Sequence, residues 1–244
     1  IRRFQAAAPA ALLTLHRVPN PREFGVATLE GDRVVGVVEK PADPPSDLAV
    51  AGIYLFSPAV HAAIAGLRPS HRGELEITDA VARLLADGHL VLGHTLTGWW
   101  EDAGSAAGLL TANARLLASL PANIHPSAVL AEVAIEGPVQ VGPGAELRRV
   151  RLKGPVVIGA GCRVTDSEIG PSTSVGDGAI LAGVTVANSV LLPGCRLQGP
   201  ALHLADSVVG AGAHVWARAG HPAALVVGDD AHLLIPQQRR QPRR

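Results

Sequence analysis

Short apolar runs alternate with turn sequences in the first part of the chain. Residues 11–15, 34–38 and 50–56 are rich in aliphatic side chains, and segments with proline, asparagine or glycine separate them. Runs of this length, bounded by turn residues, are typical of strands. The pattern therefore predicts three strands of a sheet.

Apolar residues at helical spacing follow these strands. Ser57-Pro58 is expected to supply an N-cap and a proline at the first helical position, with Val60 and Ile64 on one face of the helix. A second helix is expected from residue 77 to the Asp87-Gly88 stop, and a third from Ser105 onward. Strands that alternate with helices indicate an α/β layered domain over residues 1–120.

From residue 121 onward the helical period gives way to a repeat of 17 residues. One apolar residue recurs at each step, and a Gly-x-Gly corner follows it in four of five steps; these apolar residues are Val141, Ile158, Val175, Leu192 and Val209. The spacing predicts coils with three short faces around small aliphatic side chains, with glycine at the corners. It resembles the hexapeptide-repeat proteins, which implies an all-β, left-handed parallel β-helix over residues 121–235.

Composition and charge exclude several classes of protein. The 244 residues are 48% hydrophobic, and the formal net charge is zero. A neutral chain has no global field that attracts nucleic acid or an anionic membrane, and no apolar run is long enough to span a bilayer. The two cysteines lack metal-ligand spacing, which fits a reducing cytoplasm. We expect a cytoplasmic protein without nucleic-acid or membrane partners.

The two ends of the chain suggest different things. The sequence contains no methionine, and we expect it to be the C-terminal two thirds of a longer protein. Residues 236–244 hold four arginines and no apolar side chain. This composition predicts a disordered basic tail, and a phosphate- or partner-binding segment is the alternative.

Motifs in the α/β part carry the candidate chemistry. They combine a glycine after an aromatic ring, a strand ending in acid, base and proline, a strand with a central glycine and the only tyrosine, an acid-rich segment, and a double tryptophan before an aspartate. In order, they are Phe24-Gly25-Val26, Val38-Glu39-Lys40-Pro41, Gly52-Ile53-Tyr54-Leu55-Phe56, Arg72-Gly73-Glu74-Leu75-Glu76-Ile77-Thr78-Asp79 and Gly98-Trp99-Trp100-Glu101-Asp102-Ala103-Gly104.

Each motif also has a purely structural interpretation. Glu39 can accept sugar hydroxyls and Lys40 can meet a phosphate at a strand end, or both can belong to a solvated loop. Adjacent strand residues point to opposite faces, so these two side chains are not expected to pair. Glycine within a strand suggests a close approach at Gly52. Tyr54 can be a core ring, and Asp102 can cap the following helix or bind a metal.

In this order and spacing, the motifs resemble the glucose-1-phosphate thymidylyltransferases, in the long form that carries a β-helix tail. The resemblance implies a partial Rossmann-like nucleotidyltransferase domain that turns glucose 1-phosphate and dTTP into dTDP-glucose and pyrophosphate in deoxysugar or antibiotic biosynthesis. The family's glycine-rich phosphate loop and second metal aspartate do not occur in this sequence. We therefore expect the chain to be inactive alone.

The resemblance also implies roles for individual residues. The sugar-binding residues would be Phe24, Gly25, Glu39, Lys40, Val50, Gly52 and Tyr54. Lys40 and Arg72 would act on phosphate as catalytic residues, and Asp102 would hold Mg²⁺. Glu101 and Ala103 replace residues that are usually lysine and threonine in the family, and the added negative charge at Glu101 is expected to weaken diphosphate binding if it faces the site.

Two other functions remain open. A hexapeptide-repeat acyltransferase would need a catalytic histidine, for which His203 and His214 lack a supporting acidic neighbour in the sequence. A regulatory or oligomerisation subunit would use the solenoid for contacts, because an exposed solenoid end is an edge that favours self-association. The expected partners are sugar 1-phosphate, a nucleoside triphosphate (dTTP or UTP) and a further copy of the chain in a homo-oligomer.

Overall fold

Two compact units make up the chain. The computed structural model describes residues 1–217 and 221–235, so the expected tail over residues 236–244 lies outside the described residues. Contacts divide the chain into Ile1–Trp100 and Glu101–Arg244. Each unit has a hydrophobic core of its own. The domain boundaries expected at residues 120 and 235 stay predictions.

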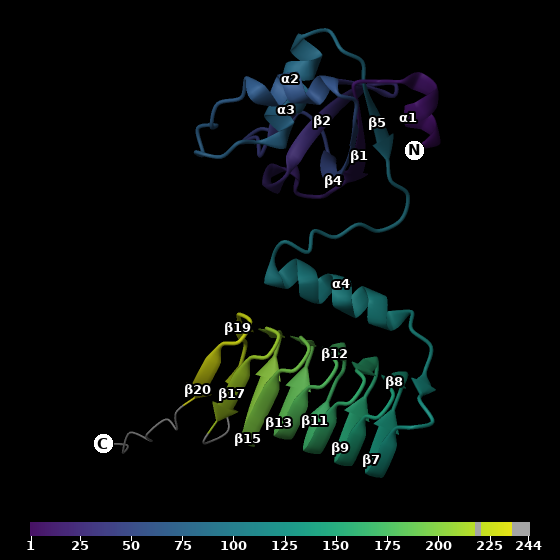
Figure 1. Cartoon of the computed structure of the whole chain (residues 1–244), viewed down its shortest axis with the longest axis vertical. Coiled ribbons are helices and arrows are strands. Elements are labelled where there is room, and N and C mark those ends of the chain that lie inside the picture. Colours follow the sequence, from purple (N-terminus) through teal and green to yellow (C-terminus); the bar gives the residue numbers. More distant parts are fainter. Residues whose placement is uncertain (218–220, 236–244) are drawn as a thin grey trace, which may run out of the picture. The chain divides into compact units, whose positions relative to one another are not determined.

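A five-stranded sheet closed into a barrel forms the first unit, with strand order β1-β4-β2-β3-β5. Figure 1 labels β1, β2, β4 and β5 of this sheet. β1 pairs parallel with β5 and antiparallel with β4, and β2 pairs antiparallel with β3. Three strands, β1, β3 and β4, were expected from the sequence, whereas β2 and β5 were not. The strands are β1 (Ala11–Arg17), β2 (Gly25–Glu30), β3 (Arg33–Glu39), β4 (Leu48–Phe56) and β5 (Val91–Thr95).

Helices α2 (Ala59–Ala65) and α3 (Ile77–Ala86) pack on this sheet, and a short α1 (Arg2–Ala7) and a 3-10 turn (Pro21–Glu23) complete the unit. α3 begins and ends where the sequence predicts. The prediction for α2 is wrong in two details. Pro58 rather than Ser57 is the N-cap, and Ile64 is 45% exposed. Val60 and Ala63, three residues apart, are the residues that α2 buries instead.

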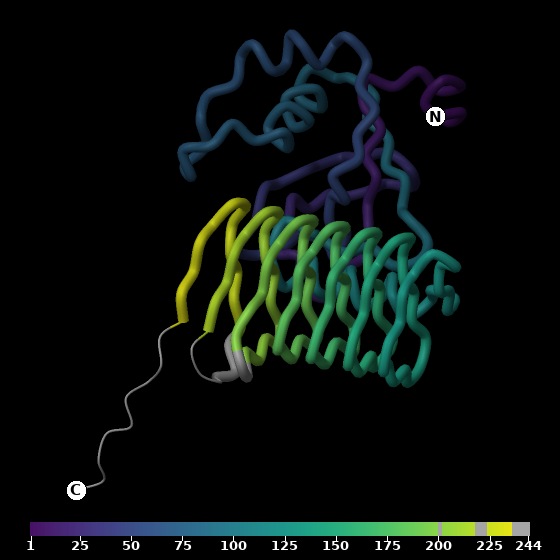
Figure 2. Tube along the Cα trace, turned by 60° about the horizontal axis from the view of Figure 1, so that its bottom comes forward, coloured from purple at the N-terminus to yellow at the C-terminus, as the bar shows by residue number. Residues whose placement is uncertain are grey.

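Stacked parallel coils form the second unit, as Figure 2 shows. One seven-stranded and one eight-stranded parallel sheet run along the solenoid. The expected fold class, an α/β domain followed by a parallel β-helix, is thus confirmed. The seven-stranded sheet contains β6 (Asn123–Ile124), β8 (Val139–Val141), β10 (Val156–Ile158), β12 (Thr173–Val175), β14 (Val190–Leu191), β16 (Val208–Val209) and β19 (Val226–Val227).

The eight-stranded sheet bends within its strands. Four of these strands contain one residue with a left-handed backbone conformation: Glu132, Arg149, Asp166 and Gly183. One long strand therefore covers two of the three expected faces. The strands are β7 (Val129–Glu136), β9 (Glu146–Lys153), β11 (Arg163–Ile169), β13 (Ile180–Ala187), β15 (Arg196–Ala205), β17 (His214–Ala217) and β20 (His232–Ile235), and β18 (His221–Ala223) pairs with β15 outside this order.

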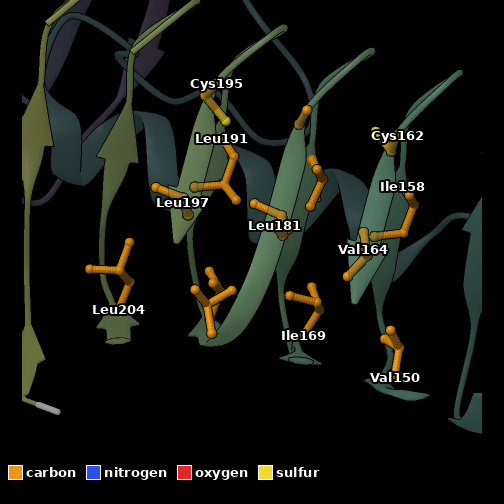
Figure 3. Packing of buried hydrophobic residues seen from close by; sticks show 14 of the residues in the cluster. Val150, Ile158, Cys162, Val164, Ile169, Leu181, Leu191, Cys195, Leu197 and Leu204 are labelled. Carbon is orange, nitrogen blue, oxygen red and sulfur yellow. The ribbon is translucent and has the colours of Figure 1, made fainter. Parts of the chain in front are cut away.

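Layers of small aliphatic side chains fill the solenoid (Figure 3). The apolar residue predicted at each 17-residue step is almost fully buried at Ile158 and Val175, but the prediction is wrong at Leu192. β14 places Leu191 opposite Val175, because the turn between β13 and β14 is one residue shorter than in the preceding coil. The next step along the chain, from Leu191 to Val209, is one residue longer than the 17-residue repeat. The corner glycine is therefore Gly194, with a φ of 70°.

Helix α4 (Ala106–Ala118) lies along the seven-stranded sheet of the solenoid. Ser105 caps it as predicted, since its hydroxyl accepts a hydrogen bond from the Gly108 amide at 3.1 Å. The Asn113 side chain donates to the Ser172 carbonyl at 3.1 Å and accepts from the Ser174 hydroxyl at 2.5 Å. Within the described residues, no helix has the length and apolar character to cross a membrane.

Candidate functional site

Strands β2, β3 and β4 and the start of α3 bring four residues together. Gly25 lies directly opposite Glu39 in the β2–β3 ladder. A Cβ atom at Gly25 would lie 2.7 Å from Thr78 Cγ2, 3.1 Å from Glu39 Oε2 and 3.7 Å from Val50 Cγ2. The absence of a side chain at Gly25 is therefore what allows the Glu39 carboxylate to approach this strand.

The Glu39 carboxylate is the most polar group at this place. Its side chain is only 20% exposed. Oε2 accepts a hydrogen bond from the Thr78 hydroxyl at 2.9 Å, and Oε1 lies 3.7 Å from Nη1 of Arg72. A carboxylate has about four acceptor positions, so these contacts leave capacity for hydroxyl groups of a ligand.

Arg72 is surrounded by carboxylates on the loop before α3. Besides Glu39, its guanidinium contacts Glu74 at 3.2 Å and Glu76 at 3.3 Å. The Ser70 hydroxyl also donates to Glu76 at 3.2 Å and accepts from the Arg72 amide at 3.1 Å. These contacts hold the loop in place and keep a five-donor cation beside Glu39, where it can meet a phosphate.

Lys40 continues the chain beyond β3 in an unusual backbone conformation. It is exposed and has a φ of 40°. Its amide donates to the Phe24 carbonyl at 3.0 Å. Among the described residues no ion pair joins Lys40 to Glu39, as the alternation of strand residues predicts. The Lys40 ammonium can therefore meet an anion without first leaving Glu39.

Tyr54 packs against the core and is also affected by the charge of Glu39. Its ring stacks on Phe56, with centroids 5.6 Å apart, and packs against the core of the first unit. Burial raises the pKa of the Tyr54 hydroxyl, and the charge of Glu39 raises this pKa further. The core interpretation and the pocket interpretation of Tyr54 are thus compatible.

Gly52 lies where β4 bulges against β1. The register shifts between Leu13 and Leu15, and Gly52 has a φ of 81°. A Cβ atom at Gly52 would meet no atom of the chain within 4 Å. The conformation of the bulge, rather than a close approach of this chain's own atoms, therefore accounts for the glycine.

Phe24 joins an aromatic cluster at the start of β2. Its ring packs edge-on against Trp100 with centroids 5.4 Å apart, and His16 lies 5.9 Å from the same indole. Trp100 Nε1 donates to the Ala51 carbonyl at 3.2 Å. This bond fixes the indole beside β4, where it packs on Phe24. The sugar-binding role of Phe24 stays a prediction.

Asp102 belongs to the second unit. Its Oδ1 accepts a hydrogen bond from the Gly104 amide at 2.9 Å. Since Ser105 caps α4, the capping role considered for Asp102 is not what the structure shows. Asp102 is exposed, and its role as a metal ligand stays a prediction.

Two residues of this region were missed as site residues, although their motifs were recognised. Thr78 is 3% exposed and hydrogen-bonded to Glu39, and Trp100 packs on Phe24. A threonine at the start of a helix usually indicates a cap, so no local pattern predicts that its hydroxyl bonds to a residue of a strand. A tryptophan in an aromatic-poor chain was the available signal for Trp100.

The chain is similar to known nucleotidyltransferases. Residues 1–119 match the nucleotidyl transferase family. The chain is 42% identical over 200 residues to a glucose-1-phosphate thymidylyltransferase from Streptomyces griseus, a match that covers 82% of this chain and 56% of that protein. A second protein of this name, from Streptomyces antibioticus, is 39% identical over 192 residues, or 78% of this chain and 54% of that protein.

A relative with a different name covers slightly more of the chain. The low-salt glycan biosynthesis nucleotidyltransferase of Haloferax volcanii is 40% identical over 215 residues, which is 87% of this chain and 60% of that protein. The matches to these three curated relatives thus span 54–60% of their lengths.

Proposed function

We propose that the chain, whose residues 1–119 match the nucleotidyl transferase family, contributes the sugar-binding part of a sugar-1-phosphate nucleotidyltransferase. The reaction would join glucose 1-phosphate to the nucleotide of dTTP, giving dTDP-glucose and pyrophosphate. The names of two relatives support this choice of substrates. UTP is the alternative nucleotide.

The convergence of Gly25, Glu39 and Thr78 is the observation that supports this proposal. A hexose presents several hydroxyls in fixed directions, and a partly buried carboxylate can accept two of them at once. Thr78 holds one oxygen of Glu39, which fixes the direction of the other. Phe24, Val50, Gly52 and Tyr54 would form the apolar and backbone wall of the pocket.

Lys40 and Arg72 would handle the phosphate. In the proposed reaction a phosphate oxygen of the sugar phosphate attacks the α-phosphorus of the nucleoside triphosphate, and the bond to pyrophosphate breaks. No side-chain nucleophile is needed, because positioning and charge neutralisation supply most of the acceleration in such transfers. Arg72 would exchange contacts with Glu74 and Glu76 for the phosphate, and Lys40 would approach from the exposed side.

Asp102 would provide a carboxylate for Mg²⁺. Among the described residues there is no group of three or more side chains that could hold a metal ion. Proteins commonly bind Mg²⁺ with one or two carboxylates together with substrate phosphates and water. Bound there, the ion would neutralise phosphate charge. The cytoplasmic location and the homo-oligomer expected from the sequence also stay predictions.

Calorimetric titration of the whole chain with glucose 1-phosphate and with dTDP-glucose tests the proposal. We expect Glu39→Gln and Lys40→Ala to weaken binding roughly ten- to a hundredfold, because each loses a charged hydrogen bond. Glu30→Gln and Arg33→Ala change charges at the far end of the same β2–β3 ladder and should leave binding unchanged. Equal affinity in all four variants would refute the pocket and favour a regulatory or acyltransfer role.

A further inference from the structure

Two histidines lie side by side on the outer surface of the solenoid, in its last described coils. His214 of β17 and His232 of β20 are directly paired in the parallel ladder. Their ring centres are 4.7 Å apart, and the rings are tilted by 53°. Val215, the next residue on β17, points into the core and is fully buried, whereas His214 is half-buried and His232 is exposed. Both imidazoles are therefore open to a solvent-borne ligand.

The spacing of the two rings fits a shared metal ion. With metal–nitrogen bonds of about 2.1 Å and ring nitrogens roughly 1.2 Å from the ring centre, two imidazoles on one ion have centres about 4.7 to 5.4 Å apart at cis or tetrahedral angles. The observed 4.7 Å lies at the lower end of this range. The strands fix this separation, so metal binding would need only small turns of the rings.

The surroundings limit the kind of ion that could bind. No group of three or more metal-ligating side chains occurs in the described part of the chain, so water would complete the coordination. Arg196 lies on the other side of His214 in the same ladder, and its charge opposes a cation. This opposition is weakened because Arg196 is exposed and screened by salt. Only ions with a strong preference for imidazole would bind.

We propose that His214 and His232 form a two-imidazole site for a transition-metal ion, of the class Cu²⁺, Ni²⁺ or Zn²⁺. Imidazole suits these ions, and affinity for nitrogen ligands rises toward Cu²⁺. Mg²⁺ prefers oxygen ligands and does not compete. A bound ion joins β17 to β20, and it stabilises the last coil because it binds the folded ladder and not the separated strands.

Trp216 offers a built-in reporter for this site. Its ring centre lies 5.3 Å from His214 and 5.8 Å from His232. Titration of the untagged whole chain with CuCl₂ should quench tryptophan fluorescence and should reach one ion per chain in calorimetry. Trp216→Phe should remove most of the quenching but keep the calorimetric binding, because Trp216 is the tryptophan whose ring contacts both His214 and His232.

Single variants separate a chelate from general binding to histidine. His214→Gln and His232→Gln should each raise the Kd for Cu²⁺ roughly tenfold or more, because one imidazole loses the high effective concentration of the second. His203→Gln is the matched control, since His203 is exposed on β15 between Thr185 and Pro222. It should bind Cu²⁺ as the unmodified chain does.

The coordination itself can be read without any variant. The electron paramagnetic resonance spectrum of the Cu²⁺-loaded chain should show coupling to two imidazole nitrogens. Coupling to a single imidazole, or unchanged affinity in both His214→Gln and His232→Gln, would overturn the proposal. Circular dichroism and thermal melting of each variant without metal establish whether a loss of affinity reflects the site or a loss of folding.

Discussion

Gly25 has no room for a side chain. A methyl group there would come within 2.7 Å of Thr78 Cγ2 and 3.1 Å of Glu39 Oε2. Both neighbours are held by their mutual hydrogen bond, so neither can move away without breaking it. We expect Gly25→Ala to lower the free energy of unfolding by about 1–3 kcal/mol and to weaken sugar-phosphate binding. Urea unfolding and calorimetric titration measure the two effects.

Gly36 provides the control for this change. It lies on β3 of the same sheet, and a Cβ atom there would have its nearest neighbours at 3.9 Å. Gly36→Ala should change the free energy of unfolding by no more than about 0.5 kcal/mol. If the two alanine variants were equally stable and bound ligand equally well, the tight packing at Gly25 would contribute neither to stability nor to binding.

Tyr54 reports on Glu39 through its own titration. It is the only tyrosine in the chain, so the absorbance of tyrosinate follows this residue alone. Burial and, next, the negative charge of Glu39 raise the pKa of its hydroxyl above 10.0. In Glu39→Gln the second cause is removed, and the pKa should fall toward that ordinary value. Glu30→Gln, at the far end of the ladder, should leave the titration curve in place.

The same shift gives a pH dependence of stability. The neutral phenol is favoured in the folded chain, so its contribution is complete below the pKa of about 10 of unfolded tyrosine. It is lost as the pH rises from there through the higher pKa of the folded state. Urea midpoints should therefore fall more steeply above pH 10 for the unmodified chain than for Tyr54→Phe. Parallel curves for the two proteins would contradict the shift.

Individual site residues show what the sequence can and cannot predict. The place of Glu39 at a strand end was predictable, because acid, base and proline end β3 together. Its register opposite Gly25 was not, because that depends on the pairing of β3 with β2, a strand that the pattern did not predict. Thr78 was not, because its contact with Glu39 depends on how α3 packs on β3. Such a contact joins residues 39 positions apart, and no local pattern encodes it.

The corners of the solenoid need glycine because the backbone there adopts a left-handed conformation. Gly161 has a φ of 62°, and a Cβ atom there would meet nothing within 4 Å. Gly161→Ala should therefore destabilise the solenoid by about 1–2 kcal/mol, from backbone strain alone. Gly161→Asn should cost less, since asparagine enters the left-handed region more readily. If asparagine cost as much as alanine in urea unfolding, strain would not be the cause.

Burial in the core of the solenoid makes its two cysteines unreactive. Cys162 and Cys195 are fully buried and free. Burial, and secondarily the charge of Cys162, raises the pKa of Cys195 to about 12, and burial also raises the pKa of Cys162. The thiolate is the reactive form. Both thiols should thus resist a soluble disulfide reagent at neutral pH until urea unfolds the chain, and rapid labelling of the folded chain would show that the coils open.

The periodicity of the solenoid was predictable because each coil repeats the same burial, but its irregularities were not. Leu192 follows the 17-residue step, yet the structure buries Leu191 and leaves Leu192 at a corner. Two adjacent leucines fit either register in sequence. Packing against Val175 and a left-handed Gly194 decide between them. Likewise, Ile64 suited the apolar face of α2, but the structure buries Ala63 in the core of the first unit instead.

The two units of the chain have separate cores. The core of the first unit joins the barrel to α2 and α3, and that of the second lies within the coils. Neither core includes a buried residue of the other unit. A local loss of packing should consequently affect one unit and spare the other, provided that each unfolds cooperatively.

Differential scanning calorimetry can test this independence. Leu84, at 1% exposure, and Leu181, at 0%, are matched core leucines of the first and second unit. Leucine to alanine at either position should cost about 2–5 kcal/mol, because it removes apolar contacts and leaves a cavity. We expect two heat-absorption transitions, of which Leu84→Ala lowers one and Leu181→Ala the other. A single transition that both variants shift equally would mean that the units unfold together, since a cooperative whole responds to the loss of any core contact.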